Sequence, residues 1–270
     1  MTDALVASLG MYDFPWTAAA NDALWAAVAE RLRAAGVDAP HGLSRGGDLR
    51  EIWRNPKLIF GQTCGYPYIK QLRGAVALIA TPIYAFAGCQ GSSHRSVIVA
   101  NIRRTRRALV DFAGARAAIN GRDSNSGMNL FRATIAPIAQ GRAFFGQVMV
   151  TGSHEASLAA VSGGEADIAA IDCVSFALLQ HWRPELTQNV ETIAHSPRSP
   201  ALPFIMSADL AKAHLGAVRA ALFAALEDPA LKAPRATLGL AGAEILSDAD
   251  YDRVARIEQD AIAAGYPTLA

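Results

Sequence analysis

Apolar runs of strand length alternate with segments of helical periodicity along most of this 270-residue chain. We expect strands at 4–9, 57–62, 75–80, 96–100, 115–119, 147–150, 166–171 and 190–194. Helical segments follow several of these runs, and two long ones are expected at 208–226 and 249–264. This alternation is typical of an α/β fold with largely parallel strands, because a helix returns the chain to the end of the sheet from which it started.

Two positions in the sequence predict that the chain crosses between two lobes, one near 95–96 and the other near 202–203. The second crossing follows a segment with three prolines in seven residues, which indicates an extended connection. We expect one lobe from 1–95 plus 203–270 and a second, inserted lobe from 97–195. Small ligands usually bind in the cleft between such lobes, and a hinge motion usually closes it.

A polar segment rich in Gly, Asp and Ser, Asn-Gly-Arg-Asp-Ser-Asn-Ser-Gly at 120–127, separates the expected strand at 115–119 from an expected helix at 128–138. The same layout recurs at 151–154, where Thr-Gly-Ser-His precedes another helical segment. The first backbone N–H groups of a helix have no partner within the helix and lie at the positive end of its dipole. Both segments are therefore suited to an anion, and we predict that the chain binds a small anionic ligand.

Composition and charge argue against several classes of protein. The formal net charge is +1, so no global field attracts nucleic acid. The basic cluster at 103–107 has no interleaved aromatic residues for base stacking, and we interpret it as a solvated surface turn. No apolar run is long enough to insert into a membrane, and no His or Cys cluster has metal-ligand spacing, so we expect neither a metal nor a cofactor.

The first residues, Met-Thr-Asp, and the short apolar run at 4–9 lack the pattern of a signal peptide. As written, the chain is expected to be cytoplasmic, or periplasmic if a leader was removed. The three cysteines, Cys64, Cys89 and Cys173, are odd in number and widely spaced, and we expect free thiols. A disulfide between two of them is the alternative that the sequence leaves open.

Six segments are informative when their order along the chain is considered: Gln-Thr-Cys-Gly-Tyr-Pro at 62–67, Thr-Pro-Ile-Tyr at 81–84, His-Arg-Ser-Val-Ile-Val at 94–99, Asp-Ser-Asn-Ser-Gly at 123–127, Thr-Gly-Ser-His at 151–154 and Asp-Ile-Ala-Ala-Ile-Asp at 167–172. Together they resemble the phosphate/phosphonate-binding protein family, the substrate-binding components of ABC importers. The resemblance extends from residue 8 to about residue 251. It implies an α/β, two-lobed type II periplasmic-binding-protein fold with mixed sheets flanked by helices, and a location in the periplasm.

The resemblance also implies that an anion is held between the lobes by the Ser-rich loop, by a tyrosine of the first lobe and by a histidine at a helix start. These roles fall on Ser124, Asn125, Ser126, Tyr66 and His154. Asp172 matches a position from which some members contact the organic part of the ligand. His94 stands where the family commonly has an aromatic hydroxyl.

Each candidate has a structural alternative. Ser126 could cap the helix that follows it, a role compatible with ligand binding. Asp172 could equally be a helix cap or a ligand contact, whereas His154, within its turn, is interpreted as a ligand contact. Tyr66, between Gly and Pro, is expected to project into the cleft. The remaining candidates are Tyr84, and Tyr12 just after the first strand.

The leading functional hypothesis is a solute-binding protein that captures a phosphonate, phosphate or related oxyanion or organic acid and presents it to an ABC permease, or serves as a sensor. The alternative is a cytoplasmic enzyme on the same fold, of the type that makes thiamine-pyrimidine or menaquinone precursors. His154 and Asp172 could form an acid–base pair, but the sequence pairs no nucleophile with them and contains no nucleotide loop or Gly-x-Ser-x-Gly turn. We therefore expect no catalytic residues.

Overall fold

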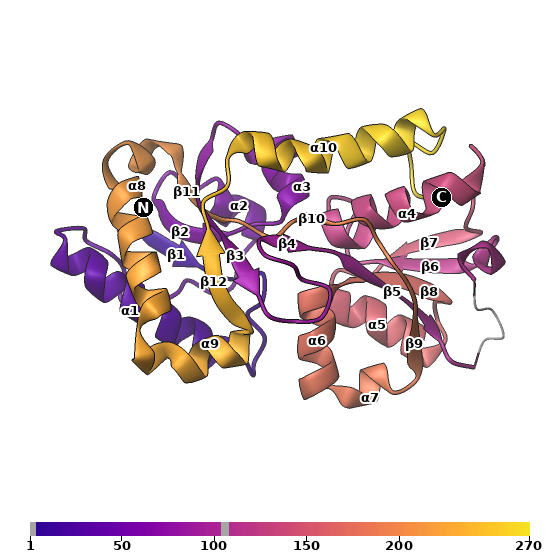
Figure 1. Cartoon of the computed structure of the whole chain (residues 1–270), viewed down its shortest axis with the longest axis horizontal. Helices are drawn as coiled ribbons and strands as arrows, with labels where there is room; N and C mark the ends of the chain where they lie inside the picture. The colour runs from indigo at the N-terminus through magenta and orange to yellow at the C-terminus, as the bar shows by residue number, and fades with distance from the viewer. Residues whose placement is uncertain (1–3, 104–107) are drawn as a thin grey trace. The chain divides into compact units, whose positions relative to one another are not determined.

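The structure, a computed structural model, describes residues 4–103 and 108–270 (Figure 1). The chain forms two compact units: unit 1 comprises Met1–Ala85 and Pro200–Tyr251, and unit 2 comprises Phe86–Ser199 and Asp252–Ala270. These units differ from the expected lobes in two places, because unit 2 begins earlier in the chain and includes most of the last helix. Of the basic cluster at 103–107, residues 104–107 lie outside the described part.

Unit 1 contains a five-stranded sheet among its described residues, in the order β1-β2-β11-β3-β12. Its strands are β1 (Val6–Ser8), β2 (Leu58–Gln62), β3 (Val76–Tyr84), β11 (Phe204–Ser207) and β12 (Leu240–Glu244). β1 and β2 are parallel, but β11 runs antiparallel to both β2 and β3, and β12 antiparallel to β3. The prediction of largely parallel pairing is therefore wrong for this sheet. β11 follows the chain's return from unit 2, so no helical crossover within unit 1 sets its direction.

The helices of unit 1 are α1 (Ala18–Ala34), α2 (Leu49–Trp53), α3 (Gly65–Pro67) with the π-helical turn Tyr68–Leu72, α8 (Ala208–Glu227), the 3₁₀ turn Pro229–Leu231 and α9 (Lys232–Leu238). α1 packs against α8 and α9, and α8 also covers β3 and β11 (Figure 1). Leu24, Val28 and Leu32 recur every fourth residue of α1 and are buried, as one face of a helix requires. The short helices α2 and α9 were not predicted from the sequence.

Unit 2 contains a second five-stranded sheet in the described residues, in the order β7-β6-β8-β5-β9. Its strands are β5 (Ser96–Asn101), β6 (Arg116–Ile119), β7 (Gln147–Val150), β8 (Ile168–Asp172) and β9 (Val190–His195). β6 is parallel to β7 and β8, to which helices connect it, whereas β5 runs antiparallel to β8 and β9. The register places Ser96 opposite Asp172 at one end of the sheet.

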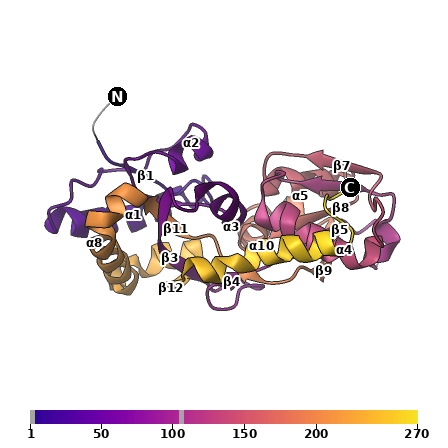
Figure 2. The same cartoon turned by 90° about the horizontal axis from the view of Figure 1, so that it is seen from above.

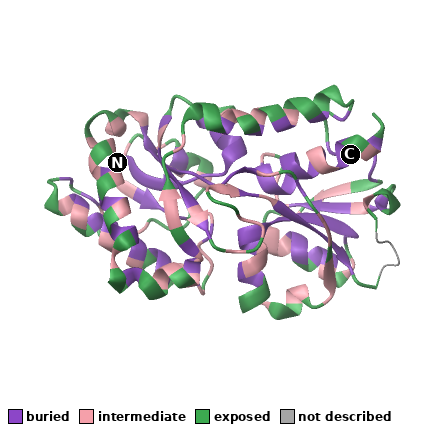
Figure 3. Ribbon diagram, viewed as in Figure 1, coloured by how far each residue is buried: buried purple, intermediate pink, exposed green. Residues whose placement is uncertain are grey.

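The helices of unit 2 are the 3₁₀ turn Leu109–Phe112, the π-helical turn Asn125–Asn129 with α4 (Leu130–Ala139), α5 (His154–Gly163), α6 (Cys173–Trp182), α7 (Pro184–Thr187) and most of α10 (Asp248–Ala263). α5 and α6 lie on one face of the sheet and α4 on the other, with α10 alongside α4 (Figures 1 and 2). Every residue of β5 and β8 is buried between these layers (Figure 3). These two strands therefore form the core that carries the candidate site.

β3 extends four residues beyond the strand expected at 75–80. After a loop, β4 (Ser93–His94) pairs with β10 (Ser199–Pro200), which lies in the proline-rich segment predicted to be extended. Within residues 4–103 and 108–270, no helix has both the length and the apolar character needed to span a bilayer.

Two glycines of unit 2 offer a test of its packing. A Cβ atom on Gly146, just before β7, would lie 2.6 Å from the backbone oxygen of Gly114. Since backbone cannot move aside as a side chain can, Gly146→Ala should lower the free energy of unfolding by roughly 1–3 kcal/mol. Gly163→Ala in α5, where a Cβ meets nothing within 4 Å, should instead raise it by about 0.4–1 kcal/mol. Urea unfolding followed by circular dichroism measures both, and an unchanged Gly146→Ala variant would contradict this close approach.

Candidate ligand-binding site

Asp172 ends β8 and caps α6 in unit 2. Its Oδ1 accepts hydrogen bonds from the backbone N–H groups of Val174 and Ser175, both at 2.9 Å. Its Oδ2 lies 2.7 Å from Nδ1 of His94 on β4. The side chains of Asp172 and His94 are only 2% and 1% exposed, respectively. Both carboxylate oxygens are thus engaged inside the protein, and the helix-cap interpretation of Asp172 is the one that the geometry shows.

Ser126 and His154 form a second polar pair. Ser126 lies in the π-helical turn that begins at Asn125, and His154 is the first residue of α5. Ser126 Oγ lies 2.9 Å from Nε2 of His154. The backbone oxygen of Ser126 accepts a hydrogen bond from Ser96 Oγ at 2.8 Å, which attaches this turn to the end of β5. The two strand–loop–helix segments singled out in the sequence therefore meet.

Ser124 and Asn125 support that turn. Ser124 is its N-cap, and Ser124 Oγ accepts a hydrogen bond from the N–H of Gly127 at 2.9 Å. Asn125 is fully buried, donates through Nδ2 to Ser199 Oγ and accepts through Oδ1 from Asn129. The cap expected at Ser126 is therefore at Ser124, and the Asn125 side chain holds the loop in place.

Gly127 permits this turn to approach its neighbours. A Cβ atom at this position would lie 1.9 Å from Oδ1 of Asn120 and 3.3 Å from Cε1 of His154. Any larger residue would displace one of these side chains, so the glycine that ends the Asp-Ser-Asn-Ser-Gly segment has a steric role.

Two buried ring nitrogens in this part of unit 2 have no hydrogen-bond partner among the described residues: Nε2 of His94 and Nδ1 of His154. His154 as a residue is partly exposed, but its Nδ1 is shielded from solvent. Buried polar atoms are nearly always paired, so a pair of orphaned nitrogens requires an explanation. A bound group that supplies acceptor atoms would provide one.

Burial disfavours the charged forms of Asp172, His94 and His154, and the neighbours of each group determine whether its pKa rises or falls. Burial alone would raise the pKa of Asp172, but the hydrogen bond and the charge of His94 lower that pKa to about 2. Burial alone would lower the pKa of His94, but the hydrogen bond and charge of Asp172 outweigh it, so this pKa is raised. For His154 burial dominates and lowers the pKa to about 4. The cluster thus favours an ionised His94–Asp172 pair beside a neutral His154.

This arrangement differs from that of a nucleophilic enzyme. In a Ser-His-Asp triad one imidazole contacts both the hydroxyl and the carboxylate. Here Ser126 contacts His154 whereas Asp172 contacts His94, so the two halves belong to different imidazoles. An ionised His94 has N–H donors on both ring nitrogens, and serine hydroxyls can also donate. The cluster is therefore equipped to donate hydrogen bonds to an acceptor.

Three candidate tyrosines lie in unit 1. Tyr84, at the end of β3, accepts a hydrogen bond through its hydroxyl from Gln62 Nε2 at 3.1 Å. Its ring meets that of Tyr12 edge to face, with centroids 5.5 Å apart. Tyr66 lies on α3, with the Lys70 ammonium 5.7 Å from its ring centroid. The structure thus brings Tyr12 and Tyr84 together, both buried, while Tyr66 is nearly as buried on a separate element.

Sequence reasoning missed the serines that organise the site. Ser96, Ser196 and Ser199 are all buried, and Ser196 Oγ accepts a hydrogen bond from the N–H of Ser96 at 2.8 Å. Serine is common in loops, so nothing in its local sequence marks such a role. The one available signal was position, because Ser96 opens the β-branched run that forms β5.

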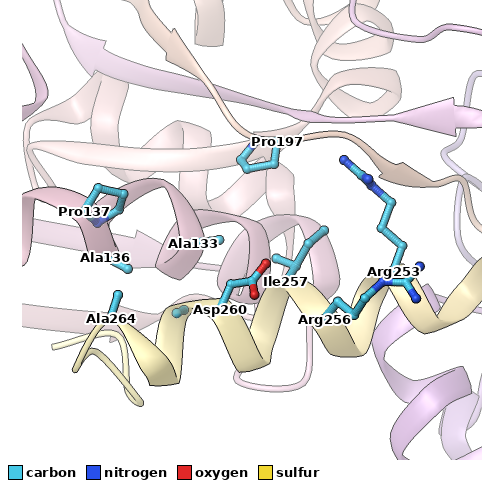
Figure 4. Close-up of a pocket in the computed structure, with 10 residues that line it drawn as sticks. Ala133, Ala136, Pro137, Pro197, Arg253, Arg256, Ile257, Asp260 and Ala264 are labelled. Atoms are coloured by element: carbon cyan, nitrogen blue, oxygen red, sulfur yellow. The ribbon is translucent and has the colours of Figure 1, made fainter.

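A pocket of about 340 Å³ lies elsewhere in unit 2, between α4, α10 and Pro197 (Figure 4). Its lining combines alanines with Arg253, Arg256 and Asp260 and contains none of the predicted site residues. Arg253 Nε donates to the backbone oxygen of Arg198. The pocket is thus separate from the histidine cluster, and we assign no ligand to it. Within the described residues no group of three metal-binding side chains occurs.

The lowered pKa of His154 predicts a pH dependence of stability. Between about pH 6.5 and pH 4 the unfolded chain binds a proton at His154 that the folded chain does not, so the free energy of unfolding should fall as the pH falls, by up to about 1.4 kcal/mol per pH unit. Asp172 contributes only at lower pH, because its pKa is lowered from 3.8 to about 2 and its contribution to stability is lost only below about pH 3.8. Urea unfolding from pH 7 to pH 4.5 should show a shallower decline for His154→Gln than for the native chain. Equal slopes would show that His154 titrates normally.

Comparison with known proteins identifies the family. The model of a family described as "ABC transporter, phosphonate, periplasmic substrate-binding protein" matches residues 48–251. A comparison with curated proteins found no match.

Solved structures share the fold. A binding-protein component of an ABC phosphonate transporter from Pseudomonas aeruginosa matches with a TM-score of 0.76 and 16% identity, over 97% of this chain and 88% of that one. PhnD1 of Prochlorococcus marinus in complex with methylphosphonate matches with a TM-score of 0.72 and 13% identity, over 95% of this chain and 97% of that one. A Xanthomonas citri protein bound to a chloride ion matches with a TM-score of 0.75 and 15% identity, over 97% of this chain and 99% of that one.

These likenesses confirm the predicted type II periplasmic-binding-protein fold, with mixed sheets flanked by helices. The family match favours the binding hypothesis over the enzyme alternative, because the family is a substrate-binding component of a transporter. It also confirms the resemblance read from the six sequence segments. The chain belongs to the family of periplasmic substrate-binding proteins of phosphonate ABC transporters.

Proposed function

We propose that unit 2 binds a small oxyanion, a phosphonate, phosphate or related acid, through Ser124, Ser126, His94 and His154. The observation that supports this proposal is the pair of buried ring nitrogens, His94 Nε2 and His154 Nδ1, that lack a protein partner in the described part of the chain. A buried polar group without a hydrogen bond costs about 1–3 kcal/mol. An oxyanion that accepts from both nitrogens would recover this cost on binding.

Helix geometry favours the same ligand. The π-helical turn at Asn125–Asn129 leads into α4, and α5 begins at His154, so two helix N-termini meet where Ser126 contacts His154. Each terminus carries a partial positive charge, and Ser124 and Ser153 each cap one of its N–H groups. The two helix N-termini and the two unpartnered imidazole nitrogens can all donate to an anion. The charge of Asp172 does not offset them, because it is neutralised by His94.

Asp172 has a positioning role in this proposal. Its two oxygens hold His94 and the start of α6, so it acts on a ligand through His94 rather than by direct contact. The relatives are consistent with anion binding: one solved structure contains methylphosphonate and another chloride. The identity of the preferred oxyanion is to be determined by titration with several probes.

Isothermal titration calorimetry with methylphosphonate, inorganic phosphate, methanesulfonate and acetate tests the proposed function. At least one of these probes should bind the native chain. Ser126→Ala combined with His154→Ala should weaken that binding by roughly 1.5–3 kcal/mol, or about 10–10²-fold in Kd, because one proton of the Ser126–His154 pair is left for the ligand and a hydrogen bond to a charged group contributes about 1.5–3 kcal/mol.

The matched control removes a serine and a histidine from the same unit outside the cluster. Ser162→Ala combined with His181→Ala, near the end of α5 and on the exposed part of α6, should leave the affinity unchanged. The site assignment is rejected if the cluster variant, folded by circular dichroism, binds as tightly as the native chain.

We further propose that the protein acts in the periplasm and delivers its ligand to an ABC permease, as expected for this family. Osmotic shock of the native host should release the protein with the periplasmic fraction, as detected by antibody. Retention with cytoplasmic markers would instead favour a cytoplasmic sensor.

A further inference from the structure

Two of the three cysteines face each other next to the candidate site. Cys89 Sγ and Cys173 Sγ are 3.4 Å apart, although 84 positions separate them in the sequence. Cys173 is buried at the start of α6, whereas Cys89 is partly exposed in the loop at 85–92. Both residues belong to unit 2, and Cys64 belongs to unit 1.

The loop approaches α6 closely at Gly88, and hydrogen bonds fix the backbone of the segments on both sides of this contact. Gly88 adopts a φ of +95°, and a Cβ atom there would lie 2.8 Å from Cys173 Cβ, so only glycine permits this approach. Arg198 Nη1 donates to the backbone oxygen of Gly88 at 2.6 Å, and the N–H of Cys173 donates to the backbone oxygen of Arg95 at 3.1 Å. The sulfur–sulfur separation of 3.4 Å exceeds the roughly 2.05 Å of a disulfide bond by a small side-chain displacement.

We propose that Cys89 and Cys173 form a disulfide when the chain meets a thiol–disulfide oxidant, and that Cys64 remains a thiol. The biological setting of this reaction rests on the proposed location in the periplasm, which is an oxidising compartment. The sequence alone favoured three free thiols, since it cannot show which cysteines are neighbours.

Exposure determines the order of the steps. The Cys89 thiolate attacks one sulfur of the oxidant's disulfide, that S–S bond breaks, and the oxidant's other sulfur leaves as a thiolate. The Cys173 thiol then loses its proton and attacks Cys89 Sγ, and the oxidant's remaining sulfur leaves as the second thiolate. Two cysteine thiols thus lose two protons and two electrons, and the oxidant is reduced to two thiols. The hydrogen bond with Cys89 and burial raise the pKa of Cys173, so its thiolate is scarce and the second step depends on the proximity of the two sulfurs.

The bond would secure the geometry of the site. Cys173 directly follows Asp172, and the loop that carries Cys89 leads into His94. A disulfide would therefore link the segments on both sides of the His94–Asp172 pair by a covalent bond. Because it would close a long loop, the oxidised chain should melt about 5–10 °C above the reduced chain.

Thiol counting after controlled oxidation tests the proposal without a ligand. The full chain is reduced, equilibrated with excess oxidised glutathione, alkylated with N-ethylmaleimide and analysed by intact-mass and peptide mass spectrometry. The expected result is one alkylated thiol at Cys64 and a peptide that joins Cys89 to Cys173. Three alkylated thiols, a bridge to Cys64 or a persistent glutathione adduct on Cys89 would each overturn the proposal.

Variants separate pairing from misfolding. Cys64→Ser should still form the bridge, whereas Cys89→Ser, at a partly exposed position that a serine suits, should leave Cys173 reduced and remove the rise in Tm on oxidation. Titration calorimetry of the oxyanion probes on the same samples is an independent measurement of ligand binding. A bridge without oxyanion binding would reject the proposed function alone, and binding without a bridge would reject the disulfide alone.

Discussion

The side chain of Asp172 joins the end of β8 and the start of α6, which are adjacent in the sequence, to β4, which lies 78 positions away. It ends the buried strand β8, caps α6 with one oxygen and pairs with His94 through the other. A carboxylate that is 2% exposed must have its charge compensated, and the two N–H donors and the imidazole together do this. The direction of α6, the placement of β4 and the protonation of His94 all depend on this arrangement.

This constraint also determines which chemistry is open to the candidate site. Asp172 pairs with His94, and although its charge favours protonation of His154, burial outweighs that effect, so the His154 imidazole stays neutral and contacts Ser126. A neutral imidazole next to a hydroxyl, with an ionised imidazole close by, offers donors to an anion without a carboxylate-activated base. The chemistry of the cluster therefore agrees with membership of a substrate-binding family.

Close backbone approaches let the cluster form in a small space. Gly127 allows the π-helical turn to lie against Asn120 and His154, and Gly88 allows the cysteine loop to lie against α6. In both places a Cβ atom would collide with a neighbouring side chain, Asn120 for Gly127 and Cys173 for Gly88. The surroundings of the two histidines are thus densely packed, and the proposed disulfide would secure that packing from the loop side.

Much of unit 2 was predictable because its signals are local. The apolar run of β8, the polar segments at 120–127 and 151–154 and the helical periodicity that follows them specify strands and helix starts within a few residues of one another, although the expected cap at Ser126 lies at Ser124. The suitability of two loops for an anion could be read for the same reason, since caps and helix dipoles are properties of adjacent residues. Short helices such as α2 and α9 escaped prediction, because few residues carry their periodicity.

The sequence by itself determined the residue types at the end of the sheet and the helices that begin there. Only the tertiary structure decided that Asp172 pairs with His94 instead of His154, that Ser126 meets His154, and that Cys89 lies beside Cys173. It also decided that β5 and β11 run against their neighbours. Pairings between residues 28, 78 or 84 positions apart depend on strand order and register. Those follow from how whole elements pack, because local sequence specifies an element's type but not its neighbour.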